Sequence, residues 1–245
     1  MIYIKTDEEI EKMRLACKIT GDTLKLVEEK IKVGMTTLEL DKIAYDYITG
    51  CGAKPSFLGL YGFPGTACIS IDEQVVHGFP SDRVIEEGQI VSFDVGAYIN
   101  GFHGDAARSF YVGAIAPEKK RLIEVTKLCF FEAIKVVMPG GAVGDIGYAV
   151  QTYAEKNGFS VVRDMVGHGV GRHLHEDPSV PNFGKRGVGA RLKKGMTLAI
   201  EPMINMGGYE VIIDDWKCVT KDGLPSAHYE NTIALTDNGV EILTL

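Results

Sequence analysis

The feature that most restricts the fold is the dipeptide Asn100-Gly101, which separates two apolar, strand-like runs at 90–99 and 102–112. Asn-Gly between two such runs is the strongest short-range signal for a β-hairpin with a two-residue turn. A turn of that length also fixes which residues of the two strands face each other. The sequence therefore predicts an antiparallel hairpin of known register.

Two aspartates lie on this hairpin. The register places Gly96 opposite Asp105 and Asp94 opposite Ala107, so both carboxylates project to one face as diagonal neighbours. Diagonal Cβ atoms lie within roughly 7–8 Å. Converging carboxylates could therefore hold two ions about 3.5–4 Å apart, the usual two-metal spacing, and Gly96 is expected to leave room for them. The alternative is a pair of ordinary solvent-facing aspartates, and a one-residue slip in register would separate the two.

Three further polar residues stand in apolar surroundings. Glu201 interrupts the run 196–204, Glu230 precedes another apolar run, and His168 lies in a glycine-rich stretch with three histidines at 167–175. Buried carboxylates need cations, and Arg108 is the only nearby basic residue. Carboxylates with an imidazole suit divalent Mn, Fe, Co or Zn. The alternatives for 167–175 are a solvent loop or a phosphate-binding loop, but the stretch does not match G-x-G-x-x-G.

The order of predicted elements is two helices followed by strands, occurring twice. Thr6 is a candidate N-cap for a helix that ends before Gly34, and Pro117 begins the third helix. The second predicted helix covers 37–48, the third 117–137 and the fourth 143–156. The predicted strands are 67–71, 90–99, 102–112, 160–166, 197–204 and 229–235.

A weak internal sequence similarity supports a duplication, although chance similarity between amphipathic helices is the alternative. We expect one catalytic domain over 1–245, with pseudo-repeats at about 1–115 and 116–245. Two such α-α-β halves could form one curved sheet with helices outside and a cleft where they meet. The similar positions are Gly34, Glu39, Leu40 and Ala44, which correspond to Gly140, Asp145, Ile146 and Val150, 106 positions later.

Composition excludes several other classes. A net charge of −7 argues against binding to a nucleic-acid backbone. Five scattered cysteines form no C-x-x-C pair, which argues against a disulfide framework or a thiolate zinc site. The chain lacks a signal-peptide layout and any run of eighteen apolar residues. We therefore expect a cytoplasmic protein, a monomer, with neither nucleic acid nor membrane as a partner.

Five motifs, in order along nearly the whole chain, resemble those of methionine aminopeptidases of the bacterial, short, type I kind. The resemblance implies an α+β pita-bread fold, with two pseudo-twofold-related halves and an antiparallel-rich sheet. It also implies removal of the initiator methionine from nascent polypeptides whose second residue is small, a reaction that could take place at the ribosome. The motifs are Ser70-Ile-Asp-Glu-Gln-Val-Val-His77-Gly, Ser92-Phe-Asp94-Val-Gly through Gly104-Asp105, Gly167-His168-Gly through His175, Ile200-Glu201-Pro202-Met203 and Tyr229-Glu230-Asn231-Thr232.

The same resemblance implies a dinuclear metal centre. Asp94 would bind one ion, His168 and Glu201 the other, and Asp105 and Glu230 both. A hydroxide between the two ions would attack the peptide carbonyl. Glu201 would also move the proton, and two further residues, His77 and His175, would hydrogen-bond the substrate; each of these histidines could alternatively be a loop residue satisfied by its neighbours.

The resemblance further implies an apolar slot for an unbranched thioether side chain. This chain departs from the usual family pattern at Leu60 and Leu174, where aromatic residues are common, and at His228 and Asn231, where Gln and His are common. The implied substrate-binding residues are Leu60, Phe63, Cys68, His77, Leu174, His175 and Trp216.

Two rival functions remain open from the sequence. One is a proline-specific peptidase of the same fold, although those enzymes usually carry a large extra N-terminal domain. The other is a binding protein that has lost catalysis, but such relatives are expected to lose metal ligands, and all five candidates are present here.

Overall fold

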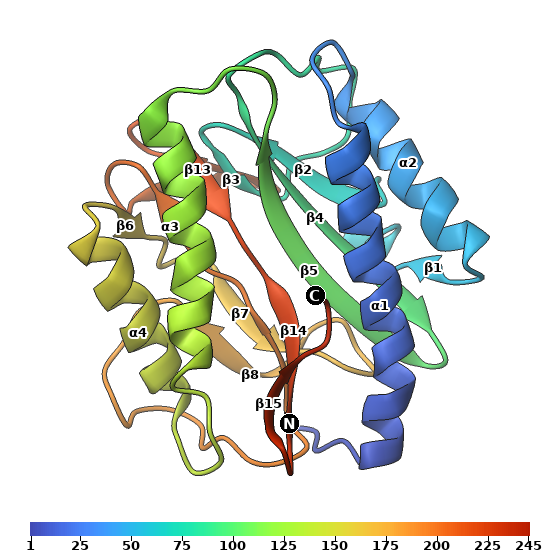
Figure 1. The fold of residues 1–245 in the computed structure, drawn as a ribbon, viewed down its shortest axis with the longest axis vertical. Helices are drawn as coiled ribbons and strands as arrows, with labels where there is room; N and C mark the ends of the chain where they lie inside the picture. The colour runs from blue at the N-terminus through green and yellow to red at the C-terminus, as the bar shows by residue number, and fades with distance from the viewer.

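The computed structural model describes all 245 residues and has four helices packed on the outside of a set of β-sheets (Figure 1). Thr6 begins the first helix with a capping box: its hydroxyl accepts the Glu9 amide, and the Glu9 carboxylate accepts the Thr6 amide. Pro117 takes the first position of the third, where its missing N–H costs nothing. The helices are α1 (Asp7–Lys30), α2 (Thr37–Gly50), α3 (Pro117–Ile134) and α4 (Val143–Lys156).

The strands form four hydrogen-bonded sheets, and every ladder between them is antiparallel. The strands are β1 (Lys54–Pro55), β2 (Ala67–Ile71), β3 (Gln74–Val76), β4 (Ile90–Ile99), β5 (Phe102–Tyr111), β6 (Ser160–Val161), β7 (Val166–Gly169), β8 (Glu176–Pro181), β9 (Thr197–Ile200), β10 (Met203–Asn205), β11 (Val211–Asp214), β12 (Lys217–Thr220), β13 (Ser226–His228), β14 (Asn231–Thr236) and β15 (Gly239–Ile242); a short 3₁₀ turn, η1, covers Leu60–Gly62. The sheet orders are β1-β4-β2 with β5 beside β4, β13-β10-β6, β11-β12-β3 and β15-β14-β9-β7-β8.

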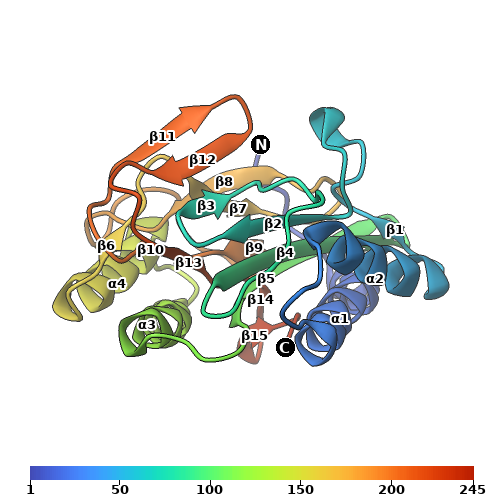
Figure 2. The same cartoon turned by 90° about the horizontal axis from the view of Figure 1, so that it is seen from above.

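Two apolar cores match the two halves. One lies between α1, α2 and the strands β2, β4 and β5 and includes the fully buried Phe93. The other lies between α3, α4 and the C-terminal strands and includes the fully buried Phe130. Seen from above, the two helix pairs flank the sheets on the same side (Figure 2). The predicted α+β pita-bread fold is confirmed. None of the four helices combines the length and apolar character that a bilayer crossing requires.

The predicted hairpin register is confirmed in full. Asn100 and Gly101 both have positive φ, 56° and 85°, as a two-residue hairpin turn that follows the strand twist requires. Gly96 pairs with Asp105, and Asp94 lies opposite Ala107.

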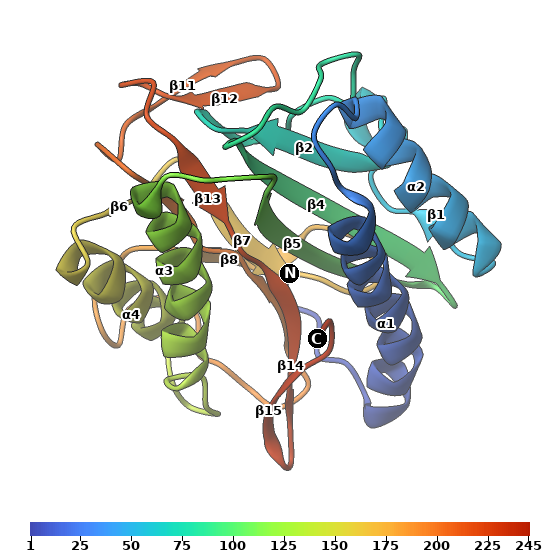
Figure 3. The same cartoon turned by 45° about the horizontal axis from the view of Figure 1, so that its top comes forward.

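Two predicted strands are interrupted. In the run 160–166 only β6 and Val166, the first residue of β7, are strand, because 162–165 form a bend, and the run 197–204 is divided into β9 and β10. The second break falls at Glu201-Pro202, where proline has no N–H to continue a ladder. There the chain leaves β14 and begins to pair with β13, the strand that leads into β14 (Figure 3). The sequence reading also missed the short strands β1, β3, β8, β11, β12, β13 and β15.

The turns before α2 and α4 are built alike. Gly34 and Gly140 have φ of 89° and 88°, and each donates its N–H to a later loop, at Ile85 O (2.9 Å) and Leu192 O (2.8 Å) respectively. Each helix then starts at an isolated antiparallel bridge, Thr36 to Val84 in one half and Ala142 to Arg191 in the other. Corresponding residues of the two turns are 106 or 107 positions apart, which matches the spacing of the internal sequence similarity.

Candidate metal centre

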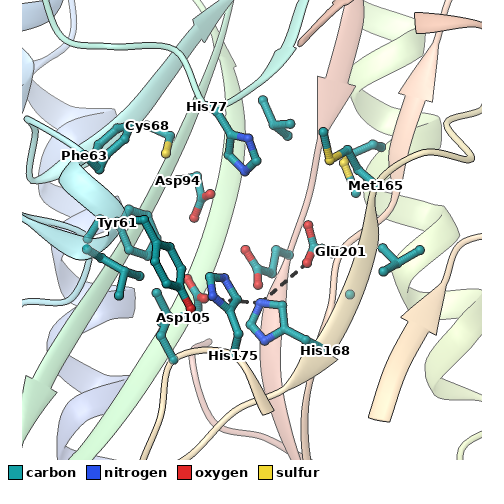
Figure 4. A pocket seen from close by; sticks show the side chains of 18 of the residues that line it. Tyr61, Phe63, Cys68, His77, Asp94, Asp105, Met165, His168, His175 and Glu201 are labelled. Atoms are coloured by element: carbon teal, nitrogen blue, oxygen red, sulfur yellow. Dashed lines mark ion pairs between the residues drawn. The ribbon is translucent and has the colours of Figure 1, made fainter. Parts of the chain in front are cut away.

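The five predicted ligands line one cavity of about 420 Å³. Asp94 and Asp105 come from β4 and β5, whereas His168 comes from β7. Glu201 follows β9 at the proline break, and Glu230 directly precedes β14. In Figure 4 the labelled ligands point toward a common centre. Both halves of the chain therefore contribute to one site.

The distances place an imidazole against the carboxylates. Nε2 of His168 lies 3.7 Å from Asp105 Oδ2 and 3.7 Å from Glu201 Oε1. Its Nδ1 donates to the carbonyl of Gly169 at 2.8 Å, so Nε2 presents its lone pair to the cavity. Asp105, His168 and Glu230 can each offer a ligand atom within 4.8 Å of the other two. Neutral imidazole held in this way is the form that binds metal.

No basic side chain neutralises the four carboxylates. Asp94 Oδ1, Asp105 Oδ1 and Glu230 Oε1 are buried without a hydrogen-bond partner. Arg108, the only basic candidate from the sequence, instead donates to the carbonyl oxygens of Ala107 and Glu230 and to the side-chain oxygen of Asn231. Orphaned buried carboxylate oxygens beside a free imidazole nitrogen fit divalent cations.

The electrostatics agree with that fit. Burial raises the pKa of Asp105 to about 7. Burial and then the neighbouring carboxylates raise the pKa of Asp94, Glu201 and Glu230 well above the ordinary range. Burial, followed by the charge of His175, lowers the pKa of His168 to about 4. Cations would relieve the carboxylate repulsion and would find the imidazole neutral.

Gly96 does not have the role expected from the sequence. A Cβ at Gly96 would lie 2.8 Å from Ser56 Cβ and 2.9 Å from the carbonyl oxygen of Gly104. The space above Gly96 is therefore occupied by Ser56, which follows β1, and not by the two carboxylates. The placement of Asp94 and Asp105 on one face follows from the hairpin register.

The glycines around His168 serve close packing and not phosphate binding. A Cβ at Gly167 would lie 2.4 Å from Ala199 O, and one at Gly169 would lie 2.3 Å from Asp177 O. These glycines let β7 lie tightly against its neighbours, and this positions the imidazole. The phosphate-loop alternative for 167–175 has no support in this geometry.

An apolar slot adjoins the carboxylates. Phe57, Phe63, Cys68 and Leu174 form a buried cluster, against which Leu60 and Trp216 pack. Trp216 lies in the turn between β11 and β12, and its ring centroid is 5.5 Å from that of Phe63. All seven residues expected to bind substrate line the cavity. Eight further residues that were not predicted to bind metal or substrate also line it, namely Phe57, Tyr61, Val76, Met165, Val166, Gly167, Ser179 and Met203.

The two predicted substrate histidines both face the cavity. The ring of His175 lies 4.6 Å from that of His168 and is stacked on Tyr61, with centroids 6.3 Å apart. His77 has a positive φ of 61°, a strained conformation of the kind that clusters at functional sites. Burial lowers the pKa of both side chains, which favours the neutral imidazole.

The two departures near Glu230 differ in position. His228 is buried behind Glu201, with its Nε2 3.5 Å from Glu201 Oε2, and burial lowers its pKa to about 3. Asn231 has other partners, since its Oδ1 accepts from Arg108 and, at 3.0 Å, from Thr244. Only His228 is in contact with the ligand set.

This fold and this cluster define the class as a metal-dependent hydrolase. The model of Metallopeptidase family M24 matches residues 11–237, and the chain belongs to that family. A methionine aminopeptidase of Clostridium perfringens is 55% identical over 247 residues, covering 100% of this chain and 99% of the relative.

Solved structures agree. The methionine aminopeptidase of Rickettsia prowazekii superposes with a TM-score of 0.98 at 44% identity, with full coverage of both chains. A prolidase from Pyrococcus furiosus has the same fold with a TM-score of 0.80 at 26% identity, and this chain covers only 65% of it. Similarity over whole chains thus lies with the methionine aminopeptidases.

Proposed function

We propose that this chain is an aminopeptidase that hydrolyses the bond after the N-terminal methionine of nascent proteins and peptides whose second residue is small. The observation that carries the proposal is that one cavity combines five side chains able to ligate metal with an apolar slot closed by Phe63, Cys68 and Trp216. The full-length similarity to methionine aminopeptidases supports it.

By the family pattern, Asp94 would hold one divalent ion, His168 and Glu201 would hold a second, and Asp105 and Glu230 would serve both. When bound, such a pair of ions lowers the pKa of water and polarises the scissile carbonyl. The donor set suits Mn, Fe, Co or Zn.

The remaining polar groups position the substrate and move the proton. Glu201 faces the cavity among the other proposed ligands, so its carboxylate could take a proton from the attacking water and return it to the leaving amine. His77 and His175 face the cavity as neutral imidazoles and can donate hydrogen bonds to the substrate carbonyl. The slot excludes water from the methionine side chain.

We further propose that the chain works as a monomer in the cytoplasm, on polypeptides emerging from the ribosome. We also propose that residues 1–245 are one catalytic domain with duplicated halves. The matched turns at Gly34 and Gly140 support the duplication.

The decisive experiment compares Met-Ala-Ser with Gly-Pro peptides, using protein reloaded anaerobically with Mn, Fe or Co. Release of methionine is expected, with faster turnover when the second residue is small. Preference for the prolyl peptide would assign the chain to the proline-specific branch. Absence of both metal binding and cleavage would make it a binding protein.

A further inference from the structure

The loop that carries Leu174 and His175 is held from behind by a segment that contributes nothing to the cavity. This loop connects β7 to β8, and Gly169 pairs with Glu176 at its base. Because neighbouring residues in a strand point to opposite faces, His175 faces the cavity while Glu176 points away from it. The side chain of Glu176 is 0% exposed.

Lys5 supplies the charge partner of Glu176. Its ammonium forms an ion pair with Glu176 Oε2, and its side chain is only 3% exposed. The other carboxylate oxygen, Oε1, accepts the N–H of His173 at 3.1 Å. One buried carboxylate thus connects the N-terminal segment to the backbone of the loop, two residues before His175.

The surrounding backbone is adapted to this ion pair. A Cβ at Gly171 would lie 2.4 Å from Lys5 Cε and 2.8 Å from its Nζ, so only glycine leaves room for the lysine. The Lys5 amide donates to Gly195 O at 2.7 Å, which fixes the segment in place. An isolated bridge joins Ile2 to Asp177.

We propose that Lys5 and Glu176 are positioning residues that hold the loop 170–176 so that His175 and Leu174 face the substrate. This inference rests on the proposed function for its kinetic consequence only. A buried charge that loses its partner is strongly unfavourable, so removal of either member should displace the loop. A misplacement of about 1 Å can cost on the order of 100-fold in rate.

The test uses Lys5→Met and Glu176→Gln, with Ile146→Ala as the control because Ile146 lies in the α3–α4 core away from the cavity. We expect kcat for Met-Ala-Ser to fall by roughly 10- to 100-fold in the two loop variants, with a smaller change in KM. The control should lose thermal stability while keeping its kcat. Equal kcat in all four proteins would overturn the proposal.

A second measurement needs neither metal nor substrate. Hydrogen exchange of peptide 170–177 in metal-free Lys5→Met should accelerate relative to wild type, whereas exchange in α4 should not change. If the single variants do not fold, Lys5→Met/Glu176→Met removes both charges together and should fold. Wild-type exchange and kcat in that double variant would reject positioning. Failure of the wild type to release methionine would reject the proposed function while the exchange result stands.

Discussion

Ala107 and Glu230 exchange backbone hydrogen bonds in both directions, with N–O distances of 3.3 Å and 2.9 Å. This exchange joins β5 of the first half to the segment before β14 of the second. Glu230 is therefore placed beside the strand that carries Asp105. The two halves meet through main-chain bonds at the ligand set itself.

Arg108 reinforces this junction, because one of its nitrogens reaches the carbonyl oxygens of both Ala107 and Glu230. Arg108→Lys keeps the charge but loses the planar fork. We expect a loss of about 1–3 kcal/mol in the free energy of unfolding, measured by urea denaturation, together with weaker metal binding. Arg121→Lys, at an exposed guanidinium on α3, is the matched control. Unchanged stability in Arg108→Lys would show that the junction does not need it.

Asp105→Asn should remove nearly all activity, on the order of 100-fold or more, because one carboxylate is proposed to serve both ions. The measurement is turnover of Met-Ala-Ser after anaerobic metal loading, with the bound metal counted in parallel. Asp82→Asn, an exposed aspartate, is the control. Wild-type turnover by Asp105→Asn would refute the two-metal site.

Leu174→Ala should weaken recognition of methionine, because Leu174 is buried in the slot beside Phe57 and Cys68. Removal of these methyl groups should lower kcat/KM for methionyl peptides by roughly tenfold or more. Discrimination against longer side chains should relax at the same time. Leu128→Ala, on the exposed face of α3, should leave both unchanged. An unaltered side-chain preference would place the methionine elsewhere.

Metal binding should release protons. The folded pKa of Asp105 is about 7, above that of an ordinary aspartate, so near neutral pH the metal-free carboxyl holds part of a proton that a cation must displace. Apparent affinity should therefore rise as pH increases from about 6 to 8. Calorimetry in buffers of different ionisation enthalpy gives the number of protons directly. A pH-independent affinity would contradict this electrostatic account.

Local sequence signals predicted the hairpin and the helix starts, whereas the remaining strands and the packing around the site depend on long-range contacts. The Asn100-Gly101 turn determines its own register, so the relation of Asp94 to Asp105 was predictable. The position of Ser56 above Gly96 was not, because it depends on the pairing of β1 with β4.

Elements that depend on tertiary pairing were missed for the same reason. The short strands β11 and β12, which bring Trp216 to the slot, have no periodic run long enough to read from sequence. Met165 and Tyr61 line the cavity only because distant loops converge there. Lys5 carries no local signal either, since its partner lies 171 residues away.

The division of the ligands between the two halves has a consequence for biosynthesis. Asp94 and Asp105 are translated early, whereas Glu230 is added only after α3, α4 and the strands β6 to β13 have been made. A partly synthesised chain cannot assemble the centre, and neither can a proteolytic fragment that lacks one side. The proposed ligand set would therefore be complete only once Glu230 has been translated, late in synthesis.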